Sequence, residues 1–339
     1  MITESEATRA TDRSVRTSPR VTVVIPAFRA ANFIAEALDS VCAQTFTDFE
    51  IIVVNDVSPD TEELERVLTR YRDRVTYLKR ERNGGPGAAR NTAILAARGE
   101  YVALLDADDY WDPAFLAEQM AFFDRHPDVS LVYSDASWFA DGSRAVVGTL
   151  MTHAPSRGEP TFERLTRQEC TVGTSAVVVR RDAVVNAGLF DPDIGNYSED
   201  FDLYLRIAKS GARLAYQRKL LVHHRVHPDS LSAAPLQLQQ GALRVLRKTA
   251  ARADLTPGER EDIARTAARI EAEFNLRRAR MALSRRDFRE ALEATEAAHA
   301  FYRTWKVKAI MLGLRLFPGL LLRIDRLRGL TARRRAFGS

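Results

Sequence analysis

Four short runs of apolar residues are the feature that most constrains how this chain can fold. They lie at 21–26, 51–55, 75–78 and 101–106, and they are rich in β-branched side chains. Runs of this kind are typical of strands that are buried on both faces, as in a parallel sheet. Their starts are about 25–30 residues apart, which leaves room for the crossover helix that each parallel pair of strands requires.

Apolar side chains recur at helical spacing in the gaps between these runs, at 31–43, 61–71 and 87–97. Strands and helices therefore alternate along the first hundred residues. This order predicts an α/β domain with a mostly parallel central sheet that is flanked by helices.

The apolar pattern continues beyond residue 106. It predicts further strands at 129–134 and 175–179, a helix at 198–210 and a short strand near 220–222. The helix at 198–210 begins with acidic residues, which the helix dipole favours. We expect the whole domain to extend over residues 21–232.

Both ends of the chain differ from this domain. Residues 1–20 have no apolar stretch of the kind found in secretory signals, and they predict a disordered lead. Residues 236–339 predict an all-α C-terminal region, with helices at 276–283 and 288–298 that resemble one tetratricopeptide-like hairpin.

Charge is distributed unevenly along the chain. Of the net charge of +5, residues 303–335 contribute +9 from ten Lys and Arg and one Asp, which leaves about −4 on the remainder. This pattern argues against a nucleic-acid binder, whose basic charge is expected on the folded body.

The segment 309–322 is apolar with basic flanks, and it is too short to span a bilayer. It is either a helix packed on the body or an interfacial helix on an anionic membrane.

An acidic turn, Asp106-Ala107-Asp108-Asp109, follows the fourth apolar run directly. In open α/β sheets, ligands bind beyond the carboxyl ends of the strands. Carboxylates gathered there repel one another unless a cation lies between them, and Mg²⁺ binds one or two carboxylates together with phosphate oxygens. The alternative is a solvated acidic turn with no ligand.

Two other turns end at the same expected edge of the sheet. One holds Pro26, Ala27 and Phe28, and the other holds Asp56. An acidic side chain in this place can accept hydrogen bonds from a nucleotide base or ribose. Either turn, taken alone, is an ordinary loop.

A glycine-rich turn precedes the helix predicted at 87–97. It includes Gly85, and Arg90 lies one turn into the helix, where it can reach a phosphate or serve a structural role. The turn has neither the dinucleotide-binding fingerprint nor the P-loop pattern.

Two later motifs also carry ionisable groups. Glu199 and Asp200 stand at the predicted start of a helix, where one can act as a general base while Ser198 caps the helix. In the segment 223–227, His227 can bind a metal and Arg225 can pair with a diphosphate, or the segment is a polar loop.

Taken in order, these motifs resemble the family-2 glycosyltransferases of the GT-A fold, over residues 21–232. The matching segments are VTVVIPAF, EIIVVND, NGGPGAARN, YVALLDADD, SEDFDLYLRIA and HHRVHPDSLS. The resemblance implies that Asp106 and Asp108 hold Mg²⁺ or Mn²⁺ on the diphosphate of a nucleotide sugar, with Asp109 a less certain ligand. It also implies that Ala27, Phe28 and Asp56 line the base and ribose, that Asp200 is the catalytic base, and that Gly173 and Thr174 lie near the acceptor.

The expected reaction is therefore a single displacement that inverts the anomeric carbon. The expected acceptor is a saccharide or a lipid-linked saccharide, in cell-surface polysaccharide or glycolipid assembly. We expect a cytoplasmic protein, peripheral on the inner face of the cell membrane through residues 303–335, with no nucleic-acid partner. The alternatives are a nucleotidyltransferase on a similar sheet and a non-catalytic scaffold with a helical interaction tail.

Overall fold

The computed structural model describes residues 18–142 and 145–321 and divides them into two compact units. Unit 1 comprises residues 18–137, 173–189 and 217–224. Unit 2 comprises the described residues of 138–172, 190–216 and 225–321. The chain thus passes between the units several times. The domain boundary predicted near 232 stays a prediction.

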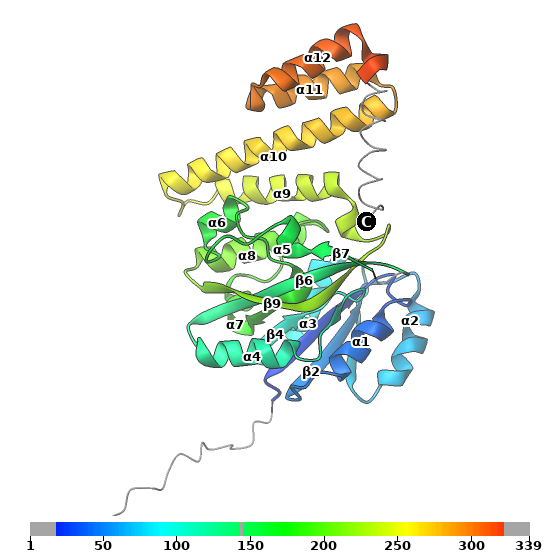
Figure 1. Cartoon of the computed structure of the whole chain (residues 1–339). Coiled ribbons are helices and arrows are strands. Elements are labelled where there is room, and N and C mark those ends of the chain that lie inside the picture. The colour runs from blue at the N-terminus through cyan, green and yellow to red at the C-terminus, as the bar shows by residue number, and fades with distance from the viewer. Residues whose placement is uncertain (1–17, 143–144, 322–339) are drawn as a thin grey trace, which may run out of the picture. The chain divides into compact units, whose positions relative to one another are not determined.

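Unit 1 is an α/β sandwich that alternates strands and helices from its first residue (Figure 1). Its first half contains β1 Val21–Ala27, α1 Ile34–Cys42, β2 Phe49–Asn55, α2 Thr61–Leu68, η1 Thr69–Tyr71, β3 Val75–Lys79, α3 Gly85–Ala96 and β4 Tyr101–Leu104. Its second half contains β5 Tyr110–Trp111, α4 Phe115–Arg125, most of β6 Val129–Ala140, η2 Thr174–Ala176, β8 Val177–Arg180, α7 Arg181–Asn186 and the centre of β9 Arg213–Val226.

The sheet follows the order β3-β2-β1-β4-β8-β6-β9-β5. Strands β3, β2, β1 and β4 are parallel, and Val24 pairs with both Ile52 and Leu104. Strands β1 and β2 are almost wholly buried, as their unbroken apolar runs predict. The predicted α/β class is confirmed.

The other half of the sheet differs from a parallel arrangement, because β8 runs antiparallel to both β4 and β6, and β5 runs antiparallel to β9. The strand predicted at 220–222 is the centre of a 14-residue strand, and the one predicted at 129–134 extends to Ala140. Both are longer than their apolar runs because polar residues continue them. The first polar residues after β4, from Asp106, leave the strand and form a turn.

Unit 2 is mostly helical. It contains β7 Val146–Thr149, α5 Leu150–His153, α6 Phe162–Thr166, η3 Pro192–Ile194, α8 Glu199–Lys209, η4 Leu231–Ala233, α9 Pro235–Ala250, α10 Pro257–Ser284, α11 Phe288–Tyr302 and α12 Trp305–Leu316. Helices α9 to α12 pack against one another in chain order (Figure 1). The helix predicted at 276–283 is only the end of α10, a 28-residue helix. Residues 1–17 of the predicted lead and the end of the predicted tail lie outside the described residues.

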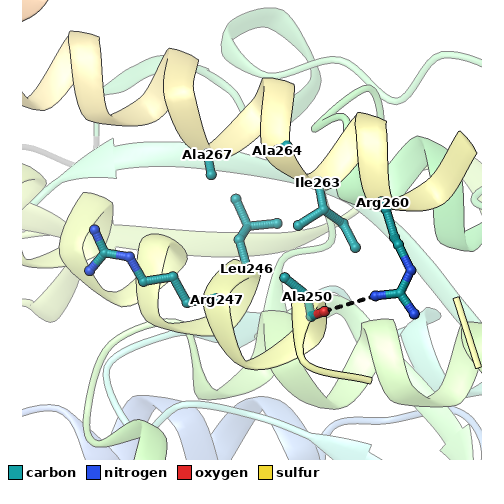
Figure 2. A pocket seen from close by; sticks show the side chains of 7 residues that line it. All are labelled: Leu246, Arg247, Ala250, Arg260, Ile263, Ala264 and Ala267. Atoms are coloured by element: carbon teal, nitrogen blue, oxygen red, sulfur yellow. Dashed lines mark hydrogen bonds between the residues drawn. The ribbon is translucent and has the colours of Figure 1, made fainter. Parts of the chain in front are cut away.

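Helices α9 and α10 leave an apolar cavity of about 280 Å³ between them (Figure 2). Leu246 and Ile263 face each other across it, and Arg260 closes one side by donating a hydrogen bond to the carbonyl oxygen of Ala250 at 3.3 Å. Small alanine side chains on α10 leave this space unfilled. Because most of the side chains that line it are aliphatic, we interpret this cavity as a gap in the packing of the two helices.

Candidate active site

The parallel half of the sheet brings the predicted motifs of unit 1 to one edge. Ala27 at the end of β1 pairs with Asn55 at the end of β2, and the Leu105 N–H donates to the Val24 carbonyl oxygen at 3.1 Å. The turn that starts at Phe28, the turn that starts at Asp56 and the acidic turn 106–109 therefore begin side by side. Polar groups gather here because the strands end here.

The acidic turn is held by two groups from distant parts of unit 1. The buried Arg90 guanidinium on α3 donates to Asp106 Oδ1 at 2.5 Å. The Ser175 hydroxyl accepts a hydrogen bond from the Asp106 N–H at 3.1 Å and donates one to Asp109 Oδ2 at 2.6 Å. Trp111 fixes Ser175 in turn, because its indole N–H donates to the Ser175 carbonyl oxygen at 2.7 Å. These contacts hold the turn in place.

The buried Asp109 carboxylate pairs with half-buried His224, whose Nδ1 lies 3.0 Å from Asp109 Oδ2. Burial raises the pKa of Asp109, against the opposing effect of His224. Burial also lowers the pKa of His224, but the Asp109 carboxylate, with smaller effects from Asp108 and Asp106, raises that pKa to about 9 overall. His224 is therefore a cation at neutral pH, and it neutralises part of the charge of the acidic turn.

The acidic turn offers carboxylates that fit a hard divalent cation. Asp109 is buried and engaged by Ser175 and His224, whereas Asp106 and Asp108 are half-buried and so more accessible. Two carboxylates with phosphate oxygens and water are the usual protein environment of Mg²⁺. Within residues 18–142 and 145–321, no group of three or more His, Cys, Asp and Glu side chains is arranged to hold a metal by itself.

Asp56 lies at the predicted edge, but its carboxylate turns inward. It is 2% exposed, pairs with Arg80 and accepts hydrogen bonds from the N–H groups of Gly84, at 3.1 Å, and Gly85, at 2.7 Å. Gly85 has a φ of +79°, a conformation that favours glycine. Asp56 therefore fixes the glycine-rich turn and the start of α3.

Two apolar side chains are exposed at this polar edge. Phe28 is 47% exposed and Val57 is 43% exposed, and they lie in the turns after β1 and β2. The Arg29 N–H ties these turns together by donating to the Ser58 hydroxyl at 2.6 Å. Arg29 and Val57 both have positive φ angles, which is rare for a residue other than glycine and costly for valine. Backbone strain of this kind is concentrated at binding sites.

Glu199 and Asp200 belong to unit 2, at the start of α8. Glu199 is buried, and half-buried Asp200 accepts a hydrogen bond from the Phe201 N–H at 2.7 Å. Ser198 has a φ of +68°, and its hydroxyl donates to the Leu238 carbonyl oxygen on α9 at 3.3 Å. The Ser198 side chain therefore does not cap α8, although the sequence predicted that it would. Helix α9 therefore holds the start of α8.

Asp200 lines a cavity of about 740 Å³ within unit 2. The other walls come from the loop after α5, the end of α6 with the loop after it, and α8, α9 and α10. Its lining mixes aromatic, amide and charged side chains, among them Phe201, Gln168 and Arg269. A cavity with this mixture suits a polar ligand that carries many hydroxyl groups.

The remaining predicted residues take other places. In unit 2, Arg225 pairs with Asp141 at 2.7 Å and lies over the ring of Phe139, and the carbonyl of His227 accepts a hydrogen bond from Ser230. In unit 1, Gly173 and Thr174 lead into η2. The metal-binding role predicted for His227 and the acceptor contacts predicted for Gly173 and Thr174 stay predictions.

Sequence reasoning missed the roles of Ser175, His224 and Arg80. Arg80 directly follows the parallel strand β3, so the sequence could have predicted that it lies at the same edge of the sheet as the acidic turn. Ser175 and His224 reach the acidic turn only through antiparallel pairings, and no local pattern indicates those.

Comparison with known proteins agrees with this geometry. Residues 22–186 match the family described as glycosyl transferase family 2. An uncharacterized glycosyltransferase of Rickettsia prowazekii is 29% identical over 212 residues, which cover 62% of this chain and 65% of that protein. The UDP-Glc:alpha-D-GlcNAc-diphosphoundecaprenol beta-1,3-glucosyltransferase WfaP of Escherichia coli is 27% identical over 63% of this chain and 80% of its own length.

A solved structure shows the same fold. The mannosyltransferase PcManGT from Pyrobaculum calidifontis, in complex with GDP-Man and Mn²⁺, has a TM-score of 0.60 at 21% identity, covering 94% of this chain and 87% of that one. The parallel strands, the acidic turn and the antiparallel half define the GT-A class of glycosyltransferase folds. Within that class, the chain is similar to glycosyl transferase family 2 over residues 22–186, just under half of its length. It spans about two thirds, 65%, of the length of the Rickettsia relative.

Proposed function

We propose that this protein transfers one sugar from a nucleotide-sugar donor to an acceptor hydroxyl, with inversion at the anomeric carbon. The acidic turn carries the proposal, because it presents Asp106 and Asp108 on a rigid frame at the carboxyl ends of parallel strands. Phe28 and Val57 offer apolar surface for a base in the adjacent turns, with Pro26 and Ala27 supporting them at the end of β1. The fold shared with a structure containing GDP-Man and Mn²⁺ supports the same assignment.

In this proposal Asp106 and Asp108 bind Mg²⁺ or Mn²⁺, which neutralises the charge that develops on the leaving nucleoside diphosphate. Arg90 keeps the Asp106 carboxylate in place by its 2.5 Å ion pair. The Asp200 carboxylate takes the proton of the acceptor hydroxyl as its oxygen attacks the anomeric carbon, and the bond from that carbon to the diphosphate breaks. One base and no enzyme nucleophile are needed. Glu199 precedes Asp200 in the chain and is buried, so the proposal assigns the proton transfer to the half-buried Asp200.

The acceptor in this proposal is a saccharide or a lipid-linked saccharide. The cavity beside Asp200 has the size and polar lining for sugar units. WfaP is named for a diphosphoundecaprenol-linked sugar acceptor, which supports a role for this protein in polysaccharide or glycolipid assembly. In this proposal that assembly takes place at the inner face of the cell membrane. Residues 21–232 form the transferase part in this proposal and residues 236–339 the helical part.

Donor binding and turnover test the two carboxylate roles separately. A panel of nucleotide sugars is titrated calorimetrically with Mn²⁺ and with EDTA, and slow donor hydrolysis is followed in parallel. Asp108→Ala is expected to lose metal-dependent donor binding. Asp200→Asn is expected to bind the donor as the wild type does but to lose about 10²–10⁴-fold in turnover, the usual contribution of a general base.

Asp182→Ala and Asp193→Asn are matched controls, because both remove an exposed carboxylate, one in each unit. Both should bind and turn over donor normally. A wild-type protein that binds no donor under any metal condition would contradict the proposal in favour of a scaffold. Formation of a nucleoside triphosphate from the donor and pyrophosphate would instead indicate a nucleotidyltransferase.

A further inference from the structure

Helix α12 has apolar side chains on two opposite faces. Val307 and Leu314 are 7% and 5% exposed, and Leu314 packs in a small core with Ala282 of α10 and Ala291 of α11. These two side chains attach α12 to the helical stack of unit 2. A helix that only completes this stack would be polar on its other face.

The opposite face of α12 is apolar as well. Trp305, Ala309, Leu312 and Leu316 follow one another at intervals of four, three and four residues, so they form one stripe along the helix. Trp305 is 75% exposed, Leu312 58% and Leu316 59%. We call these four residues the outer stripe. Scattered exposed apolar residues are normal on a protein surface, but a continuous row of them marks an interaction site.

Basic residues flank the outer stripe. Lys306, Lys308 and Arg315 are exposed, and α12 contains no acidic residue. Arg315 pairs with Glu296 of α11 at 2.5 Å, whereas the two lysines lie on either side of Trp305 in the helical projection. Phe317 and Leu320, 63% and 57% exposed, extend the apolar surface beyond the end of the helix.

We propose that α12 lies flat in the interface of an anionic bilayer. In that position the outer stripe enters the boundary of the acyl chains, while Lys306 and Lys308 extend to lipid phosphates. The helix is about 18 Å long, too short to cross the hydrocarbon core. No helix in the described part of the chain has the length and apolar character that spanning requires. This proposal is independent of the transferase activity proposed above.

Charge favours a membrane over the other possible occupants of the stripe. In a symmetric dimer built on α12, the lysines of one copy would approach those of the other, because both copies present the same patch. The chain's own residues 322–339 carry six Arg and one Asp, so they have the same sign of charge as α12. An anionic lipid surface supplies the opposite charge and an apolar layer beneath it.

Co-sedimentation of the full chain with vesicles tests this proposal. The wild type should bind vesicles that contain phosphatidylglycerol and should bind pure phosphatidylcholine much more weakly. Leu312→Glu should weaken binding to the anionic vesicles by about tenfold or more, because it puts a charge in the stripe. The double variant Lys306→Glu, Lys308→Glu should weaken it by about 25-fold or more, since each basic residue near an anionic surface contributes about fivefold.

The matched control is Leu95→Glu, which changes a leucine of α3 that is 66% exposed. It should bind as the wild type does. Insertion is read from Trp fluorescence: lipids brominated in the acyl chains should quench the wild type, and Trp305→Phe should remove most of that quenching.

Three outcomes would overturn the proposal. The wild type binds no vesicle, or Leu312→Glu binds as tightly as Leu95→Glu, or the wild type binds without any quenching of Trp305. A dimer in lipid-free buffer that Leu312→Glu dissociates, with no vesicle binding, would assign the stripe to self-association instead.

Discussion

At the scale of single residues, the Ser175 hydroxyl makes two hydrogen bonds that hold the acidic turn. It accepts one from the Asp106 N–H and donates the other to the buried Asp109 carboxylate. One side chain therefore joins both ends of the acidic turn. A serine in a predicted strand gives no hint of this, because the turn lies 69 residues earlier in the chain.

We expect Ser175→Ala to lower the free energy of unfolding by about 1–3 kcal/mol, because a buried carboxylate loses a hydrogen-bond donor. The same variant should weaken metal-dependent donor binding, since Asp106 loses part of its support. Chemical denaturation and donor titration measure the two effects. Ser134→Ala is the control: Ser134 is also buried, but its hydroxyl makes only a 3.3 Å hydrogen bond to the carbonyl oxygen of the next residue, so both effects should be small.

The sequence indicated which carboxylates reach the edge of the sheet, but not how they divide their roles. Asp106, Asp108 and Asp56 all lie where the strand pattern predicts. That Asp109 pairs with His224, and that Asp56 turns towards the glycine-rich turn, depends on residues 115 and 28–29 positions away. Spacing along a strand predicts position, whereas partners of this kind follow from tertiary packing.

At the scale of secondary structure, the start of α10 joins that helix to α8. Thr256 and Glu259 form a capping box, and the same Glu259 carboxylate pairs with Lys209 of α8 at 2.6 Å. Burial alone would raise the pKa of Glu259, but Lys209 and the Thr256 N–H outweigh it and hold that pKa below its usual 4.5. Ionised Glu259 therefore stabilises the folded state above pH 4.5, and this contribution is lost as the pH falls through its lowered pKa.

Glu259→Gln should reduce the free energy of unfolding at pH 7 by about 1–3 kcal/mol, because glutamine keeps the capping box and loses only the charge. The difference from the wild type should shrink as the pH falls below about 4.5. Denaturation curves over a pH series measure it. Thr256→Ala removes the cap instead, so its cost of about 1 kcal/mol should persist at low pH. A Glu259→Gln deficit that did not change with pH would exclude the ion pair as its cause.

Helices with a dense apolar stripe, such as α1 and α11, follow from the sequence with small errors in their ends. Helix α10 was found only in part, because its buried residues are few and widely spaced. Its capping box, Thr256 to Glu259, is a local signal that would have placed its start. Strand β9 was underestimated because it keeps exposed polar residues, among them Arg218 and Lys219, in the middle of the strand.

At the scale of the whole molecule, a ligand that binds only the folded chain must stabilise it. A nucleotide sugar with Mn²⁺ at about 100 times its Kd should add about 2.7 kcal/mol to the free energy of unfolding. For a chain of 339 residues that unfolds in one step, this corresponds to a rise in Tm of about 3–5 °C.

Calorimetry with and without EDTA measures this rise, which EDTA should abolish. Asp108→Ala should unfold at the wild-type temperature without ligand and gain nothing from the donor. An equal rise in EDTA would show that the donor binds without the metal.

The sequence could not predict that segments of the two units alternate along the chain, because periodicity indicates local structure and does not indicate which segments belong to the same unit.

The antiparallel half of the sheet also sets the order in which the protein is assembled during synthesis. Strands β1 to β4 leave the ribosome first and can pair as they appear. The acidic turn must wait for His224, 115 residues after Asp109, which takes about 6–23 s at bacterial and eukaryotic rates of elongation. Until then, Arg90 can already pair with Asp106, but Asp109 lacks its partner His224. A nascent chain therefore completes the contacts of its acidic turn late, after most of unit 1 has been translated.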